Sequence, residues 1–373
     1  MRGIIGHDAI ARQLERAAER GRLAPAYLFA GPPGVGKTTL ALALAQTALC
    51  TAPHDARPCG ACRACRQIER RNHPDLMLIE AGRSLGEQDA TPTRARVIPI
   101  ERIRVARQAA ALSPLEGQAR FFLLRNAEDM RPEAADALLK TLEEPPPRSH
   151  FLLTVLDPSL LAPTLVSRCQ RLALRPVPLP EVAAALRAHA ALPPEEVDRL
   201  AHLAQGRVGW ALQAATSERF RTQYEAMRER LIGLCHAGDH DRLAYATELA
   251  ERYERDRRAL DEPLRVWATW WRDVLLAGLG RDDGSVHIDL GALARAVALQ
   301  LTPPAVSRYL WRIAEAARLI AGDVRGHVAP DGLFVDAARV APGAAALWPT
   351  GSVNARLALE VLFLGAPRPA RVA

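Results

Sequence analysis

The sequence contains very little lysine and no long apolar run. Of its 49 basic residues only Lys37 and Lys140 are lysines, and the rest are arginines. No apolar run approaches the roughly 18–20 residues that a membrane-spanning helix needs. The first residues, Met1 to His7, contain no apolar signal core. The sequence therefore predicts a cytoplasmic protein with no membrane partner.

The overall composition is that of a globular protein. Of 373 residues, 49% are hydrophobic and 24% are charged, which excludes a disordered or fibrous chain. Since a domain typically has roughly 100–200 residues, two or three domains are expected. The net charge of +7 permits a nucleic-acid partner but does not by itself require one.

The first half of the chain alternates short apolar runs with helical periodicity. The runs at residues 26–30, 75–79, 121–124, 151–155 and 171–174 are typical of strands buried in a parallel sheet. Helices are expected between them at residues 10–20, 38–49, 100–111 and 132–142. Prolines at 176, 178 and 180 then interrupt regular structure. The pattern predicts an α/β domain over residues 1–176.

The strand signal is weak in the second half of the chain. Residues 177–217 indicate a few short helices, and residues 218–373 are dominated by amphipathic stretches such as 258–279 and 305–321. A small helical domain followed by an all-helical domain is therefore predicted. Trp267, Trp270 and Trp271 fall at helical spacing, which favours packing in a core over stacking on bases.

Residues 31–38, Gly-Pro-Pro-Gly-Val-Gly-Lys-Thr, fit the phosphate-loop pattern between a predicted strand and a predicted helix. Glycines let backbone N–H groups turn toward phosphates, the lysine supplies a point charge, and the threonine hydroxyl is a ligand for Mg²⁺. The alternative is a loop kept only as scaffold. The pattern predicts ATP or ADP binding with Mg²⁺ through Gly31, Gly34, Val35, Gly36, Lys37, Thr38 and Thr39.

Four of the six cysteines lie close together: Cys50, Cys59, Cys62 and Cys65. In a cytoplasmic protein this clustering favours a metal over disulfides. Four thiolates form a closed tetrahedral site, which makes Zn²⁺ structural rather than catalytic. An iron–sulfur cluster and unligated thiols are the alternatives. His54 and His73 are weaker ligand candidates, and the isolated Cys169 and Cys235 are expected to be buried.

The acids that a hydrolysing ATPase needs are displaced. A phosphate-loop ATPase holds Mg²⁺ with a carboxylate at the end of a neighbouring strand. After the run at 121–124 the chain places Arg125 and Asn126 at that position, with Glu128 and Asp129 further along. The sequence therefore predicts nucleotide binding with absent or weak ATPase activity.

The order of these motifs resembles the clamp-loader branch of the AAA+ ATPases. Besides the phosphate loop and the cysteine cluster, the resemblance rests on residues 4–7 (IIGH), 138–146 (LLKTLEEPP) and 167–170 (SRCQ). It implies an AAA+ α/β domain over 1–176 with a zinc module at 50–65. It further implies a helical lid domain over 177–217 and a helical collar over 218–373, whose last helix spans 354–364. Through the collar, five subunits form a ring.

The resemblance also implies a role for Arg168. In this family the Ser-Arg-Cys arginine reaches the γ-phosphate of ATP bound by a neighbouring motor subunit, as an arginine finger. The usual second-sensor arginine is absent at Gly209, with Arg207 two residues earlier. These departures resemble a largely non-hydrolysing subunit of the loader of a bacterial replicative DNA polymerase. The implied partners are the gamma or tau motor and delta subunits in a hetero-pentameric ring. Through that assembly, the sliding clamp and primer–template DNA are implied as well.

Two other functions remain open at this stage. One is a hydrolysing AAA+ motor subunit, similar to gamma or tau, in which Glu128 or Asp129 binds the metal. The other is a phosphate-loop kinase for a small molecule with a zinc-stapled lid. Ser167, Arg168 and Cys169 disfavour the kinase, as does the helical third domain.

Overall fold

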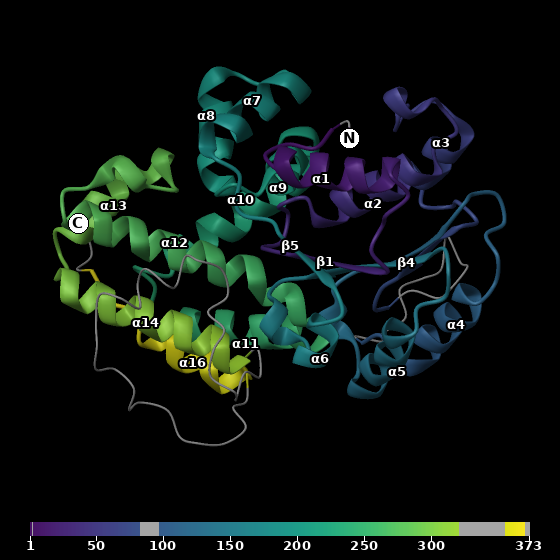
Figure 1. Ribbon diagram of the computed structural model, residues 1–373. Helices are drawn as coiled ribbons and strands as arrows, with labels where there is room; N and C mark the ends of the chain where they lie inside the picture. The colour runs from purple at the N-terminus through teal and green to yellow at the C-terminus, as the bar shows by residue number, and fades with distance from the viewer. Residues whose placement is uncertain (2, 83–96, 321–354, 370–373) are drawn as a thin grey trace. The chain divides into compact units, whose positions relative to one another are not determined.

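The computed structural model describes residues 1, 3–82, 97–320 and 355–369 (Figure 1). In the first half of the chain a five-stranded parallel sheet has the order β2-β3-β4-β1-β5. Its strands are β1 (Ala26–Ala30), β2 (Leu76–Ile79), β3 (Arg120–Leu124), β4 (Ser149–Val155) and β5 (Gln170–Ala173). Each predicted strand is confirmed to within two residues at its ends.

Both faces of the sheet are buried, as expected for a parallel sheet. Because successive side chains of a strand point to opposite faces, Leu28 of β1 lies in one core while Tyr27 and Phe29 lie in the other. Phe122 and Phe151 stack with ring centroids 4.9 Å apart on the face that carries Leu28. Continuous apolar runs therefore form strands here because neither face meets water.

Helices cover both faces (Figure 1). Packed on the core of Tyr27 and Phe29 are α1 (Asp8–Glu19), α2 (Lys37–Leu49) and α3 (Arg63–Glu69). The opposite core is covered by α4 (Ile100–Ala110), α5 (Pro132–Glu143) and α6 (Pro163–Val166). The four helices predicted for this region are confirmed, whereas the short α3 and α6 were not predicted.

The rest of the described chain is helical. Its α-helices are α7 (Leu179–His189), α8 (Pro194–Ala204), α9 (Val208–Thr216), α10 (Glu218–Gly233), α11 (Asp239–Arg255), α12 (Asp261–Gly278), α13 (Gly291–Ala298), α14 (Pro303–Ile320) and α16 (Ala355–Leu364). The predicted fold class is confirmed. Trp267, Trp270 and Trp271 of α12 are fully buried, which confirms that they pack in a core.

The last helix is held by buried polar side chains. The guanidinium of Arg242, fully buried, donates to the carbonyls of Leu234 and Cys235 and to those of Phe363 and Ala366. Because a buried cation is costly unless every donor finds an acceptor, this arrangement fixes the end of α16 against the turn after α10. The helix predicted at 354–364 is thus present from Ala355 onward.

By contacts the chain divides into two compact units. One comprises residues 1–185 and 206–210, and the other comprises 186–205 and 211–373. Within the second unit Arg199 of α8 is 2.6 Å from the carboxylate of Glu225 on α10, and Arg228 is 2.6 Å from that of Asp289. The first of these ion pairs connects residues of the predicted lid and the predicted collar, and the second lies within the predicted collar. No helix in the described part of the chain is long and apolar enough to span a membrane.

Candidate functional site

The phosphate loop connects β1 to α2, as the sequence predicts. Gly31 has a φ of 152°, and a Cβ atom there would lie 2.2 Å from the carbonyl oxygen of Leu174. Gly34 and Gly36 also have positive φ, at 77° and 109°. Because L-residues with side chains rarely adopt such backbone angles, glycine is required for this path of the loop.

Two contacts hold the loop from outside. His7 forms a hydrogen bond between its Nε2 and the carbonyl of Val35, at 3.1 Å. The amide of Gly209 donates to the carbonyl of Gly34 at 2.7 Å. Within the described residues the N–H groups of Gly34, Val35 and Gly36 donate no hydrogen bond. Unsatisfied N–H groups at the start of a helix attract anions, so the loop fits a phosphate group.

Lys37 and Thr38 begin α2 beside these amides. The Nζ of Lys37 donates to the carbonyls of Gly31 and Pro32, the latter at 3.0 Å. The lysine is buried, Thr38 is half-buried, and Thr39 is exposed. The ammonium therefore lies over the loop, where it can neutralise a phosphate. In this arrangement Lys37 and Thr38 are the residues that would hold the phosphates and Mg²⁺.

At the end of β3 a cation occupies the position of the usual metal-binding acid. The guanidinium of Arg125 is 2.6 Å from a carboxylate oxygen of Glu80, the residue after β2. Asn126 has a φ of 55°, and its N–H donates to the Thr154 hydroxyl at 2.9 Å. Glu128 lies in the 3₁₀ turn that follows. The predicted displacement of the acids is therefore present in the structure.

The segment before α9 lies against the phosphate loop. A Cβ atom on Gly34 would lie 3.4 Å from the Cβ of Arg207. Arg207 is buried, with its guanidinium 5.1 Å from the centroid of the Trp210 ring. At Gly209 a Cβ atom would lie 3.0 Å from the Gly34 carbonyl oxygen, closer than most Cβ contacts. The residue at the usual second-sensor position is thus in contact with the loop backbone.

The sequence did not predict the roles of three residues at this site: Glu80, which pairs with Arg125, and His7 and Gly209, which hold the phosphate loop. Ile79 pairs with Leu124 in the sheet, so Glu80 and Arg125 follow adjacent strand ends in register. A known strand order would have revealed that pair. His7 and Gly209 contact the loop across long stretches of chain, and no local pattern marks such contacts.

The four clustered cysteines form a candidate metal centre. Their sulfur atoms all lie within 4.8 Å of one another, and those of Cys50 and Cys62 are 3.9 Å apart. Zn–S bonds of 2.3 Å in a tetrahedron place sulfurs about 3.8 Å apart, so the four thiols fit Zn²⁺. Gly60, with a φ of 73°, forms the turn between Cys59 and Cys62. The cluster could therefore bind a metal such as zinc.

The local backbone favours the thiolate form of Cys62. Although burial raises the pKa of Cys62, hydrogen bonds from the backbone N–H groups of Cys65 and Thr51 outweigh it and lower the pKa to about 6. Burial raises the pKa of Cys65. Since the thiolate is the ligating form, Cys62 is prepared to bind a metal at neutral pH. His73 is buried, and its Nδ1 accepts a hydrogen bond from the N–H of Asp75, so this nitrogen is not available as a metal ligand.

Arg168 lies between α6 and β5, and its side chain is exposed. One guanidinium nitrogen is 2.7 Å from a carboxylate oxygen of Glu143, the last residue of α5. The other donates to the carbonyl of Thr164 at 2.9 Å. Two fixed partners hold the guanidinium in one orientation.

The remaining cysteines, Cys169 and Cys235, are buried as predicted, and burial raises the pKa of each to about 12.

Comparison with known proteins gives the following similarities. Residues 6–178 match the family model described as DNA polymerase III, delta subunit. Over 316 residues the chain is 27% identical to subunit delta' of DNA polymerase III from Bacillus subtilis, covering 84% of this chain and 91% of that protein. It is 38% identical over 185 residues to subunit delta' from Pseudomonas aeruginosa (49% of this chain, 52% of that protein). It is 29% identical over 331 residues to subunit tau from Escherichia coli (85% of this chain, 47% of that protein). The alignments thus span only about half the length of the second and third relatives.

Proposed function

We propose that this chain, which is similar to subunits delta' and tau of bacterial DNA polymerase III, acts as a delta-prime-like subunit of a clamp loader. In this role it binds ATP or ADP with Mg²⁺ but hydrolyses it little or not at all. It supplies Arg168 to the ATP of a neighbouring motor subunit.

The observation that carries the proposal is the combination of an intact phosphate loop with Arg125 at the end of β3. Arg125 is ion-paired with Glu80 at 2.6 Å, so a cation lies at the strand end where a metal ligand would stand. A cation there repels Mg²⁺, and the carboxylate beside it, Glu80, is held in the ion pair instead of activating water. The cation at Arg125 does not prevent Lys37 and Thr38 from binding the phosphates of a nucleotide.

Arg168 has the chemistry that the second part of the proposal needs. It is exposed, and a planar guanidinium neutralises charge that develops on the phosphoryl oxygens during ATP hydrolysis. Its ion pair with Glu143 connects it to the end of α5. In the proposed assembly Glu143 orients the guanidinium before the neighbouring subunit docks.

The other proposed features follow the same assignment. Zn²⁺ at Cys50, Cys59, Cys62 and Cys65 has a structural role, because four thiolates leave no position for water. Residues 1–176, 177–217 and 218–373 act as AAA+, lid and collar domains, and the collar assembles a ring of five with gamma or tau and delta. The sliding clamp and primer–template DNA are partners of the whole ring.

The test is Arg168→Ala in an assembly reconstituted with the motor and delta subunits. We expect clamp-stimulated ATP hydrolysis to fall a few-fold, because one motor site loses its transition-state contact while the others retain theirs. Arg168→Lys should rescue poorly, since an ammonium lacks the fork of donors. Nucleotide binding by this chain should not change.

The control is Arg171→Ala, which removes an exposed arginine three positions along the chain. Light scattering should first show that each variant ring forms with normal stoichiometry. An intact Arg168→Ala ring that hydrolyses ATP at the wild-type rate would refute the role in trans.

A second candidate is the hydrolysing motor subunit itself, favoured by the intact phosphate loop and by the similarity to subunit tau. In that case Glu128 or Asp129 would bind the metal. The isolated chain would then hydrolyse ATP steadily and faster with DNA, whereas the delta-prime-like assignment predicts almost no turnover.

A further inference from the structure

The outer face of α1 carries a regular row of arginines. Arg12, Arg16 and Arg20 follow one another at intervals of four residues, and all three are exposed. Residues four apart lie on the same face of a helix, about 6 Å apart along its axis. Arg22, in the turn after the helix, extends the row and is also exposed.

The guanidinium groups of the row are available to an external anion. Within the described residues no ion pair or hydrogen bond joins Arg12, Arg16 or Arg20 to another group's side chain. On α11, by contrast, Arg252 is 2.6 Å from the carboxylate of Glu248. The acidic Glu15 of α1 is bound to the N-terminal amino group. The carboxylate of Asp8 lies one turn before Arg12 on the same face, but the arginines themselves form no ion pair within the described residues.

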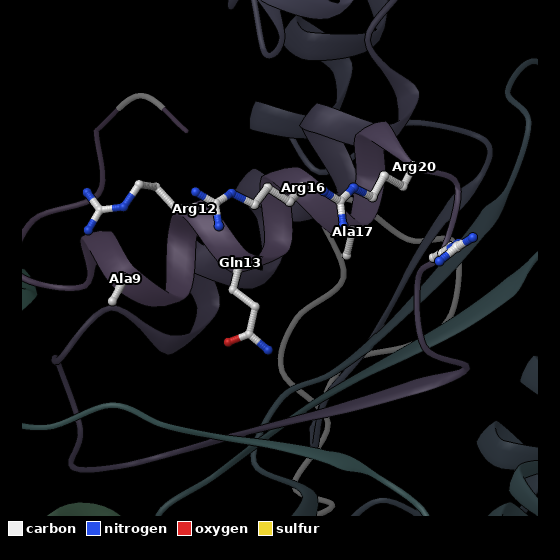
Figure 2. Close-up of a pocket in the computed structure, with 7 residues that line it drawn as sticks. Ala9, Arg12, Gln13, Arg16, Ala17 and Arg20 are labelled. Carbon is white, nitrogen blue, oxygen red and sulfur yellow. The ribbon is translucent and has the colours of Figure 1, made fainter.

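Beside the row runs an open groove of about 460 Å³ (Figure 2). The side of the groove opposite the arginines is lined by Ala9, Gln13 and Ala17, which are also four residues apart. The short side chains of Ala9 and Ala17 allow a bulky ligand to approach the helix, and the long arginine side chains on the other side can contact it. The groove contains no aromatic or large apolar side chain.

The helix that carries the row is firmly anchored. Its inner face buries Ala11 and Leu14 in the core shared with α2 and β1. None of the arginines takes part in that core. The groove is therefore a preformed surface whose charge can be changed without disturbing the packing beneath it.

We propose that the arginine row of α1 is a binding surface for the phosphate backbone of duplex DNA. Over the roughly 12 Å from Arg12 to Arg20 a duplex presents about seven negative charges, enough to engage every guanidinium. The inference stands apart from the proposed function, because it depends only on the surface of α1 and is tested on the isolated chain.

The composition of the groove favours duplex DNA over two other anionic partners. Single-stranded nucleic acid is held largely by stacking on aromatic side chains, and the groove has none. An acidic protein surface would need apolar anchors at the centre of the interface, where this groove offers only alanines and a glutamine. Phosphate contacts require only exposed cations at regular intervals.

The test measures binding of a fluorescent duplex of random sequence to the full chain over a series of salt concentrations. The triple variant Arg12→Gln, Arg16→Gln and Arg20→Gln is compared with the wild type. Because each phosphate contact contributes about 0.9 to the slope of log K against log salt, the slope should fall by about 2–3. Affinity at low salt should fall about 10-fold or more.

The matched control removes the same charge elsewhere, by Arg252→Gln, Arg255→Gln and Arg281→Gln. These arginines are exposed but lie near Glu248, Glu251 and Asp283 respectively. The control should keep most of the affinity and nearly all of the salt slope. Unfolding curves of both triple variants should match the wild type, which separates lost binding from lost structure.

Three results would overturn the proposal. One is an α1 variant whose salt slope equals that of the wild type or of the control. Another is tighter binding of a single strand than of a duplex of equal length. The third is competition by poly-glutamate that is as strong as competition by unlabelled duplex of the same total charge.

Discussion

At the scale of single residues, the path of the phosphate loop and of the segment that holds it depends on glycines that no other residue can replace. Gly206 has a φ of 79°, and a Cβ atom there would lie 2.6 Å from the nitrogen and 2.7 Å from the oxygen of Val177. Its carbonyl accepts the Val177 N–H at 3.0 Å. Gly206 therefore fixes the segment whose Gly209 amide holds the phosphate loop.

We expect Gly206→Ala to reduce the free energy of unfolding by about 1–3 kcal/mol, because a positive φ and a backbone clash both oppose the side chain. Gly233→Ala is the control, since a Cβ atom at the end of α10 meets open space. That change should be neutral or stabilise by up to about 1 kcal/mol. Urea unfolding curves give both values, and equal stability of the two variants would contradict this account of Gly206.

At the scale of elements, the cysteine centre connects the end of α2 to the start of α3. Cys50 is the residue after α2, and Cys62 precedes α3 with its sulfur accepting the Cys65 N–H. Few apolar side chains of the short α3 are buried, with Ile68 the largest. A helix of this length is marginal without tertiary support, so a metal would supply much of its stability.

Cys62→Ser should abolish stoichiometric zinc and lower the unfolding temperature, because a structural zinc site loses folding free energy with a ligand. Elemental analysis of protein purified without chelator should give one Zn²⁺ per wild-type chain. Cys169→Ala, which removes a buried thiol outside the cluster, should retain the metal. Wild-type protein with no metal, or with iron in place of zinc, would rule out the zinc site.

At the scale of the whole molecule, the contacts of the phosphate loop with His7 and Gly209 lie in one compact unit. That unit comprises residues 1–185 and 206–210, so His7 and Gly209, far apart in the chain, belong to it together with Lys37. Folding of this unit is what shapes the loop. Nucleotide binding should therefore be a property of the folded chain alone, before any ring assembles.

Lys37→Ala should remove most of the affinity for ATP and ADP, since the ammonium beside the loop amides is lost. Lys140→Ala is a close control, because Lys140 is the other lysine of the chain and is exposed at the end of α5. Calorimetry with Mg²⁺ measures both. If the wild-type protein gives no binding heat with either nucleotide, the loop does not bind nucleotide and has only a structural role.

The sequence by itself determined the elements and the residue types of the site. The strands were predictable because a strand buried on both faces is a short continuous apolar run, which can be recognised locally. The helices α1, α2, α4 and α5 were predictable because helical periodicity is also visible within each segment. The phosphate loop and the cysteine cluster were predictable because their spacing is dictated by the ligand. The missed helices, α3 and α6, are too short to show a period.

Only the tertiary structure decided how these parts meet. The strand order β2-β3-β4-β1-β5 places Glu80 beside Arg125, and this ion pair is what separates nucleotide binding from hydrolysis in our proposal. The contact of Glu143 with Arg168 likewise joins residues 25 positions apart. Sequence patterns record the preferences of neighbouring residues, whereas these pairings arise from the packing of distant segments into one core.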